Sequence, residues 1–125
     1  MKPAELQHSG THLIADLHGI AGAMLCDGDA IETLLRQAAL AAGATSVYSH
    51  FHAFGPGQGV TGVVLLAESH ISIHTWPEIG FAALDIFMCG QAAPQRALAV
   101  IETGLAPVST TLQELPRGYS VVSVT

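Results

Sequence analysis

Polar and apolar side chains alternate strictly from residue 70 to residue 76. Successive side chains of a β-strand point to opposite faces of a sheet, so this alternation predicts a strand. One face of it carries His70, Ser72, His74 and Trp76, and the other carries Ile71, Ile73 and Thr75. Buried sheet positions usually hold Val or Leu, so the polar row needs a reason other than packing.

Runs of similar character predict six further strands, at residues 11–18, 45–54, 60–67, 81–88, 108–115 and 119–124. The run 60–67 is almost continuously apolar, which predicts burial on both of its faces. In the run 45–54, one face carries Tyr48, His50, His52 and Phe54. The segment GPGQG at 55–59 indicates a tight turn. It is not a phosphate loop of the P-loop type, because no Gly-Lys-Ser/Thr follows it.

Two stretches have helical periodicity instead. Apolar residues recur at helical intervals from Ala30 to Ala42, after Asp29 and Glu32, which have the spacing of a capping box, and Gly43 ends the stretch. A second helix is predicted at residues 94–104, and its buried row consists of Ala97, Leu98, Ile101 and Leu105.

This order of elements predicts one α+β domain over residues 1–125, with a mainly antiparallel sheet and two helices on one face. The second face of the sheet must also be covered. A second subunit is the simplest candidate, since half of the residues are hydrophobic and only 11% are charged.

The charge balance narrows the choice of partners. The formal net charge is −6, and the basic residues are Lys2, Arg36, Arg96 and Arg117. A surface that follows nucleic-acid phosphates is therefore excluded, whereas a cationic ligand would suit the chain. No apolar run approaches the roughly 20 residues of a membrane span, and residues 1–5 lack the apolar region of a signal peptide. We expect a cytoplasmic protein.

The cysteines and the isolated histidines have ordinary interpretations. In a reducing compartment Cys26 and Cys89 need not pair, and Cys26 is expected to be inert. His8, His12 and His18 are expected to make only ordinary hydrogen bonds.

Three kinds of chemistry can be weighed from residue types alone. His50, His52, His70 and His74 could bind zinc, but no carboxylate or cysteine stands at a ligand spacing, so we predict no metal site. A Ser-His hydrolase using Ser69 and His74 lacks the Gly-x-Ser-x-Gly motif. The two residues also differ in parity, so Ser69 must lie in a bend before the strand if they are to meet. A lysine Schiff base, including one with pyridoxal phosphate, is set aside because Lys2 is the only lysine.

A more specific resemblance covers residues 10–90. The stretches AESHISIHTWPE (67–78) and ALDIFMCG (83–90) closely resemble the short prokaryotic S-adenosylmethionine decarboxylases. Residues 10–16 (GTHLIAD), 43–45 (GAT) and 51–54 (FHAF) extend the likeness in order and spacing.

In that family the proenzyme cuts itself before a serine, which becomes a pyruvoyl group. The resemblance therefore implies a cut between Glu68 and Ser69 that yields a beta chain, 1–68, and an alpha chain, 69–125. His74 matches the proton acceptor of this processing. Thr61 matches a serine that assists it, and Thr keeps the hydroxyl but is stiffer about χ1.

The resemblance also implies the use of this group. The pyruvoyl carbonyl would form a Schiff base with the α-amino group of S-adenosylmethionine and accept the electrons left when carbon dioxide departs. Cys89 matches the family's proton donor to the resulting carbanion. The product would be the aminopropyl donor for spermidine synthesis.

Substrate-binding candidates follow from the chemistry of the ligand. Adenine and a sulfonium favour aromatic faces, which makes Phe54, Trp76 and Phe51 candidates, and Glu78 could hold the ribose hydroxyls. His70 shares a face with His74 and is expected to border the site.

The resemblance further implies a homodimer whose two sheets face each other between outer helices, an α/β/β/α arrangement. Two alternatives stay open. One is a pyruvoyl-dependent arginine or ornithine decarboxylase on the same scaffold, and the other is a binding or regulatory homologue that never cuts itself.

Overall fold

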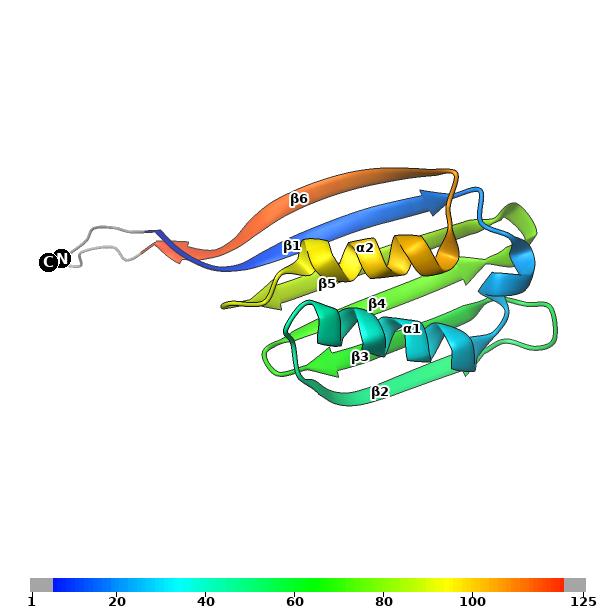
Figure 1. The fold of residues 1–125 in the computed structure, drawn as a ribbon, viewed down its shortest axis with the longest axis horizontal. Helices are drawn as coiled ribbons and strands as arrows, with labels where there is room; N and C mark the ends of the chain where they lie inside the picture. Colours follow the sequence, from blue (N-terminus) through cyan, green and yellow to red (C-terminus); the bar gives the residue numbers. More distant parts are fainter. Residues whose placement is uncertain (1–5, 121–125) are drawn as a thin grey trace, which may run out of the picture.

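The computed structural model (Figure 1) describes the backbone of residues 6–120 and the side chains of residues 10–118. Its strands are β1 (Leu6–His18), β2 (Ser46–Ala53), β3 (Val60–Leu66), β4 (Ser69–Trp76), β5 (Phe81–Cys89) and β6 (Ser109–Ser120). Its helices are α1 (Gly28–Ala41) and α2 (Pro94–Leu105), and two 3-10 helices lie at Gly22–Leu25 (η1) and Pro77–Ile79 (η2). In this part of the chain, no helix is long and apolar enough to cross a membrane.

The strands form one sheet in the order β2-β3-β4-β5-β1-β6, and every neighbouring pair is antiparallel. Both helices lie over the same face of this sheet, α1 across β2 and β3, and α2 across β5 and β1 (Figure 1). The predicted α+β fold, with its antiparallel sheet and two helices on one face, is confirmed.

The core lies between the helices and the sheet. Alternate residues of each central strand are buried there, including Leu13, Leu17, Ile71, Ile73, Leu84 and Ile86, and they meet Ile31, Leu35 and Ile101 of the helices. The alternation of the 70–76 segment therefore has the predicted meaning, since its apolar row faces the helices.

We call the other side of the sheet the open face. Its central side chains are His12, Ile14 and Asp16 of β1, His70, Ser72 and His74 of β4, and Asp85, Phe87 and Cys89 of β5. The polar row of β4 thus lies on a face that no described helix covers.

Several predicted boundaries and faces need correction. Helix α1 begins at Gly28, and its N-cap is Asp27, whose carboxylate accepts a hydrogen bond from the Ala30 amide at 3.0 Å, so Asp29 does not cap it. Strand β3 is buried on one face only, because Leu65 on the open face is 43% exposed. An apolar run alone does not distinguish a strand buried on both faces from one whose second face is open.

The C-terminal segment also differs from the prediction. Residues 109–120 form one long edge strand, β6, instead of two shorter ones. β6 pairs only with β1, and an edge strand can accommodate Pro116, which lacks an amide hydrogen. Residues 121–124 of the last predicted strand lie outside the described residues, as do Lys2 and the side chain of His8.

Candidate active site

The bond before Ser69 lies at a tight hairpin between β3 and β4. Leu66 pairs with Ser69, so Ala67 and Glu68 form a two-residue turn. Glu68 has a φ of 68°, a left-handed conformation that costs a non-glycine residue about 1–2 kcal/mol. The Ser69 hydroxyl donates to the Ala67 carbonyl oxygen at 3.4 Å.

The expectation that Ser69 precedes the strand is wrong by one residue. The bend holds Ala67 and Glu68, and Ser69 is the first paired residue of β4. The parity argument predicted a bend near Ser69 but could not show which residues form it. Two residues are enough to reverse an antiparallel hairpin, so Ser69 can already belong to the strand.

Cys89 ends β5 beside this hairpin. Its thiol donates to the carbonyl oxygen of Glu68, with Sγ 3.2 Å from the oxygen. The antiparallel pairing of β4 with β5, in register at His70 and Phe87, brings the end of β5 to the start of β4. Two residues assigned to one site by the resemblance are therefore in direct contact.

A second cluster occupies the opposite end of β4. His74 lies directly across from Thr61 of β3, and its Nδ1 is 3.1 Å from the threonine hydroxyl. A pocket of about 620 Å³ opens beside them, lined by Phe54, Gly57, Gln58, Gly59, Thr61, His74, Thr75, Trp76 and Glu78. Phe54 and Trp76 are 56% and 40% exposed, so both rings are available to a ligand.

This pocket unites most of the residues predicted for substrate binding and processing. Phe51 is an exception, because its half-buried ring lies on the helix side, in the place where a Cβ on Gly62 would stand. His70 is another, since it lies next to Phe87 near the hairpin, with ring centroids 5.9 Å apart.

Within one chain, Ser69 and His74 do not meet. Five residues of extended strand separate them, which is about 16 Å along β4. The predicted residues therefore form two separate groups, which we call half-sites, one with Glu68, Ser69 and Cys89, and one with Thr61, His74 and the pocket.

Aromatic rings continue the pocket across the sheet. Trp76 lies against Phe81 with ring centroids 5.3 Å apart, and Phe81 stacks on His18 at the same distance. Trp76 thus has a rigid neighbour in β5, and His18, expected to be ordinary, supports that neighbour from β1.

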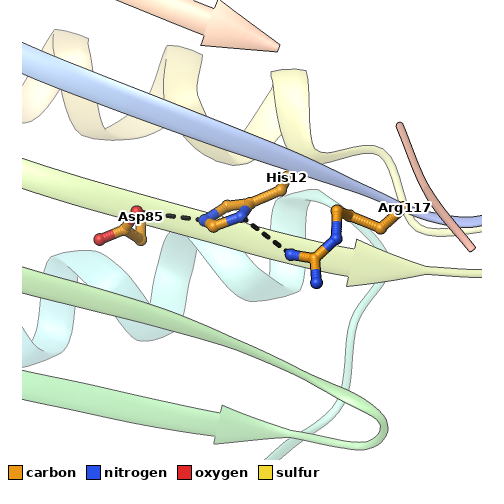
Figure 2. Close-up of polar contacts among 3 residues, drawn as sticks. All are labelled: His12, Asp85 and Arg117. Atoms are coloured by element: carbon orange, nitrogen blue, oxygen red, sulfur yellow. Dashed lines mark hydrogen bonds and ion pairs between the residues drawn. The ribbon is translucent and has the colours of Figure 1, made fainter. Parts of the chain in front are cut away.

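The structure also contains an open-face network that sequence reasoning missed. His12 Nε2 lies 3.1 Å from an Asp85 carboxylate oxygen, and Arg117 Nη1 lies 3.5 Å from His12 Nδ1 (Figure 2). Because an arginine can only donate, this arrangement requires His12 to accept at Nδ1 and donate from Nε2. The signal was weak, since the three residues are far apart in the chain and only the sheet register joins them.

The metal alternative finds no geometric support in the described residues, where no three His, Cys, Asp or Glu side chains gather as metal ligands would. His50 and His52 lie on β2, and the ring of His52 meets Phe54 edge to face at 4.6 Å.

Comparisons with known proteins identify the family of this chain. A sequence model of the S-adenosylmethionine decarboxylase family matches residues 11–118. An S-adenosylmethionine decarboxylase proenzyme of Methanococcus maripaludis is 45% identical over 90% of this chain and 93% of its own length. One from Caldicellulosiruptor saccharolyticus is 44% identical over 87% of this chain and 88% of its own length.

The crystal structure of the adenosylmethionine decarboxylase from Aquifex aeolicus superimposes on this fold with a TM-score of 0.81 and 41% identity, covering 92% of this chain and 93% of that one. The matching model and the length of the aligned relatives together show that this chain belongs to the S-adenosylmethionine decarboxylase family.

Proposed function

We propose that this protein cuts its own chain between Glu68 and Ser69 and then decarboxylates S-adenosylmethionine. The observation that carries the proposal is the contact between the Cys89 thiol and the Glu68 carbonyl oxygen, 3.2 Å apart. It joins the bond to be cut to the proposed proton donor. The names of the relatives, decarboxylase proenzymes, agree with both steps.

The hairpin suits the cutting reaction. The Ser69 hydroxyl attacks the Glu68 carbonyl carbon, and the amide nitrogen leaves, so that an ester replaces the peptide bond. The Cys89 S–H donates to the carbonyl oxygen as negative charge develops on it. The left-handed backbone at Glu68 raises the energy of the starting state, which favours the reaction.

The ester is then opened by elimination. A base removes the α-proton of Ser69, the Glu68 carboxylate leaves, and water replaces the remaining nitrogen as ammonia, so that a pyruvoyl group begins the second chain. His74 is the proposed base, and Thr61, 3.1 Å from its Nδ1, holds the imidazole. The hydroxyl that Thr61 shares with serine supports its proposed assisting role.

The surroundings of residue 69 fit a pyruvoyl group, because that position is half-buried at the start of β4 and the Cys89 thiol lies against the carbonyl oxygen of the preceding residue. Such a group supplies the electron-accepting carbonyl for decarboxylation. Cys89 remains beside it and gives its thiol proton to the substrate carbon. The pocket supplies the rest of the recognition, with Phe54 and Trp76 for the adenine and sulfonium, Glu78 for the ribose, and His70 at the border.

A homodimer would unite the two half-sites. Ser69 and His74 lie at opposite ends of β4, and they must meet for His74 to act on this bond. If two open faces pack together about a twofold axis that runs across the strands, the hairpin of one copy faces the pocket of the other. This packing also covers the exposed apolar residues of the open face, among them Leu65 and Leu115.

The intact mass of the purified protein tests the cut directly. We expect two chains, residues 1–68 and 69–125, with the second blocked by pyruvate at its first residue. Ser69→Ala should give one full-length chain, while the control Ser72→Ala, on the same strand, should still be cut. A full-length wild-type chain would contradict the proposal and favour the non-cleaving homologue.

Release of labelled carbon dioxide tests the substrate. The cut protein should release it from carboxyl-labelled S-adenosylmethionine and not from arginine or ornithine. Preferential release from arginine or ornithine would instead favour the alternative pyruvoyl-dependent decarboxylase, which would use the same self-cutting reaction. The expected product is the aminopropyl donor used to make spermidine.

A further inference from the structure

The hairpin end of the open face carries one strongly basic group in the described chain. Arg117 of β6 pairs with Gly10 of β1, and Gly10 pairs with Cys89. The other described arginines lie in the helix layer, where Arg36 donates to Ser49 and Arg96 belongs to α2. Arg117 is therefore the cation placed on the same face and in the same row as the proposed proton donor.

Its guanidinium is held in a defined position. The guanidinium carbon is 5.6 Å from the centre of the Phe87 ring, and Nη1 donates a long hydrogen bond to His12, which in turn donates to Asp85 (Figure 2). Among the described residues, His12 is its one hydrogen-bond partner, so most of the five N–H donors stay available. A stacked and partly unused guanidinium is preorganised for a planar anion.

Gly10 brings this cation close to the reacting groups. A Cβ at Gly10 would lie 2.8 Å from Phe87 Cε1 and 3.1 Å from Cys89 Sγ. Because glycine has no Cβ, the Phe87 ring beneath the guanidinium and the Cys89 thiol both approach Gly10 closely. A small ligand in contact with Cys89 would therefore lie next to the Phe87 ring, over which the Arg117 guanidinium is placed.

We infer that Arg117 binds the α-carboxylate of the substrate and so selects α-amino acids for this site, an inference that rests on the proposed function. The amine that must reach residue 69 and the carboxylate that leaves are bound to the same carbon. A carboxylate entering a chain of net charge −6, on a face that also carries Asp16 and Asp85, needs a compensating cation. Arginine matches carboxylate geometry with two parallel hydrogen bonds.

The test compares substrate with product, because only the substrate carries the carboxylate. For Arg117→Gln we expect the KM for S-adenosylmethionine to rise about 10- to 100-fold, the loss of a charged hydrogen bond, with a smaller change in kcat. The inhibition constant of decarboxylated S-adenosylmethionine should change less than twofold. Arg117→Lys should recover part of the KM, and the control Arg96→Gln should alter neither constant.

Other outcomes overturn the inference. Equal weakening of substrate and product, or a lowered melting temperature with unchanged KM, would show that Arg117 only ties β6 to β1. Dissociation of the assembly would instead assign it to the contact between copies. Intact mass and activity of the wild type separate these results from failure of the proposed function. An uncut or inactive wild type refutes that function. A cut and active Arg117→Gln with normal KM refutes only the role of Arg117.

Discussion

At the scale of single residues, Cys89 makes the most informative contact. A cysteine at a strand end is usually a small buried hydrophobe. Here the thiol is half-exposed and donates to the Glu68 carbonyl oxygen, and this contact is the basis of the roles proposed for it in the cut and in the later proton transfer. Cys26 provides the contrast, since its thiol donates to the Gly22 carbonyl oxygen of η1 and does not line the pocket beside His74.

We predict that Cys89→Ala still cuts its chain, although more slowly than the wild type, because Glu68 and Ser69 are intact and only one donor to the carbonyl is lost. Decarboxylation should fall by about 10²-fold or more, the usual contribution of a general acid. Intact mass over time and carbon dioxide release measure the two effects. Cys26→Ala is the matched control and should alter neither. Full turnover by Cys89→Ala would remove Cys89 from the catalytic step.

Residue types and the resemblance supplied most of the residues proposed for this site before any geometry was known. They could not indicate which residues share a half-site, because that depends on the register of β4 with β3 and β5. The His12, Asp85 and Arg117 network was missed for the same reason. Its members are ordinary polar residues on three strands, and only the pairing of β1 with β5 and β6 joins them.

At the scale of elements, strand alternation predicted which face each side chain from His70 to Trp76 occupies, and β4 follows that prediction. The prediction failed where apolar side chains lie away from the helix layer. Strand β3 carries apolar residues on its open face, and β6 continues through Pro116 because it is an edge strand. Both features depend on neighbours that a local pattern cannot reveal.

Thr75 joins three of these elements. It is the one polar residue buried in the described core, at 6% exposure, and its hydroxyl accepts from the Val60 amide and donates to the Leu25 carbonyl oxygen, both at 2.8 Å. It thereby joins η1, β3 and β4 directly behind His74 and Trp76.

We predict that Thr75→Val destabilises the protein by about 1–3 kcal/mol, because the Val60 amide and the Leu25 carbonyl lose their shared partner in a buried place. Denaturant unfolding measures this loss. Thr75→Ser keeps the hydroxyl and should recover most of the stability. The cut should also slow in Thr75→Val and recover in Thr75→Ser, because β3 and β4 hold Thr61 and His74 in register. Equal stability of the two variants would contradict this role.

At the scale of the whole molecule, the proposed assembly follows from the separation of the two half-sites at opposite ends of β4. No bending of β4 within one chain brings Ser69 to His74, because both are paired to neighbours along a continuous strand. If His74 is the base, it must act on the bond of a second copy.

Mixing two inactive variants tests this assembly. Ser69→Ala lacks the nucleophile and His74→Ala lacks the base, so each alone should stay uncut. In dimers that contain one chain of each kind, one site is complete, and it holds the Ser69 of the His74→Ala chain. Random pairing places roughly half of the chains in such dimers, so up to about half of the His74→Ala chains should be cut after co-expression with different tags. The Ser69→Ala chain should remain whole. If mixed dimers are recovered through both tags and the His74→Ala chain is still uncut, the two half-sites do not meet across the copies, and His74 is not the base of this reaction.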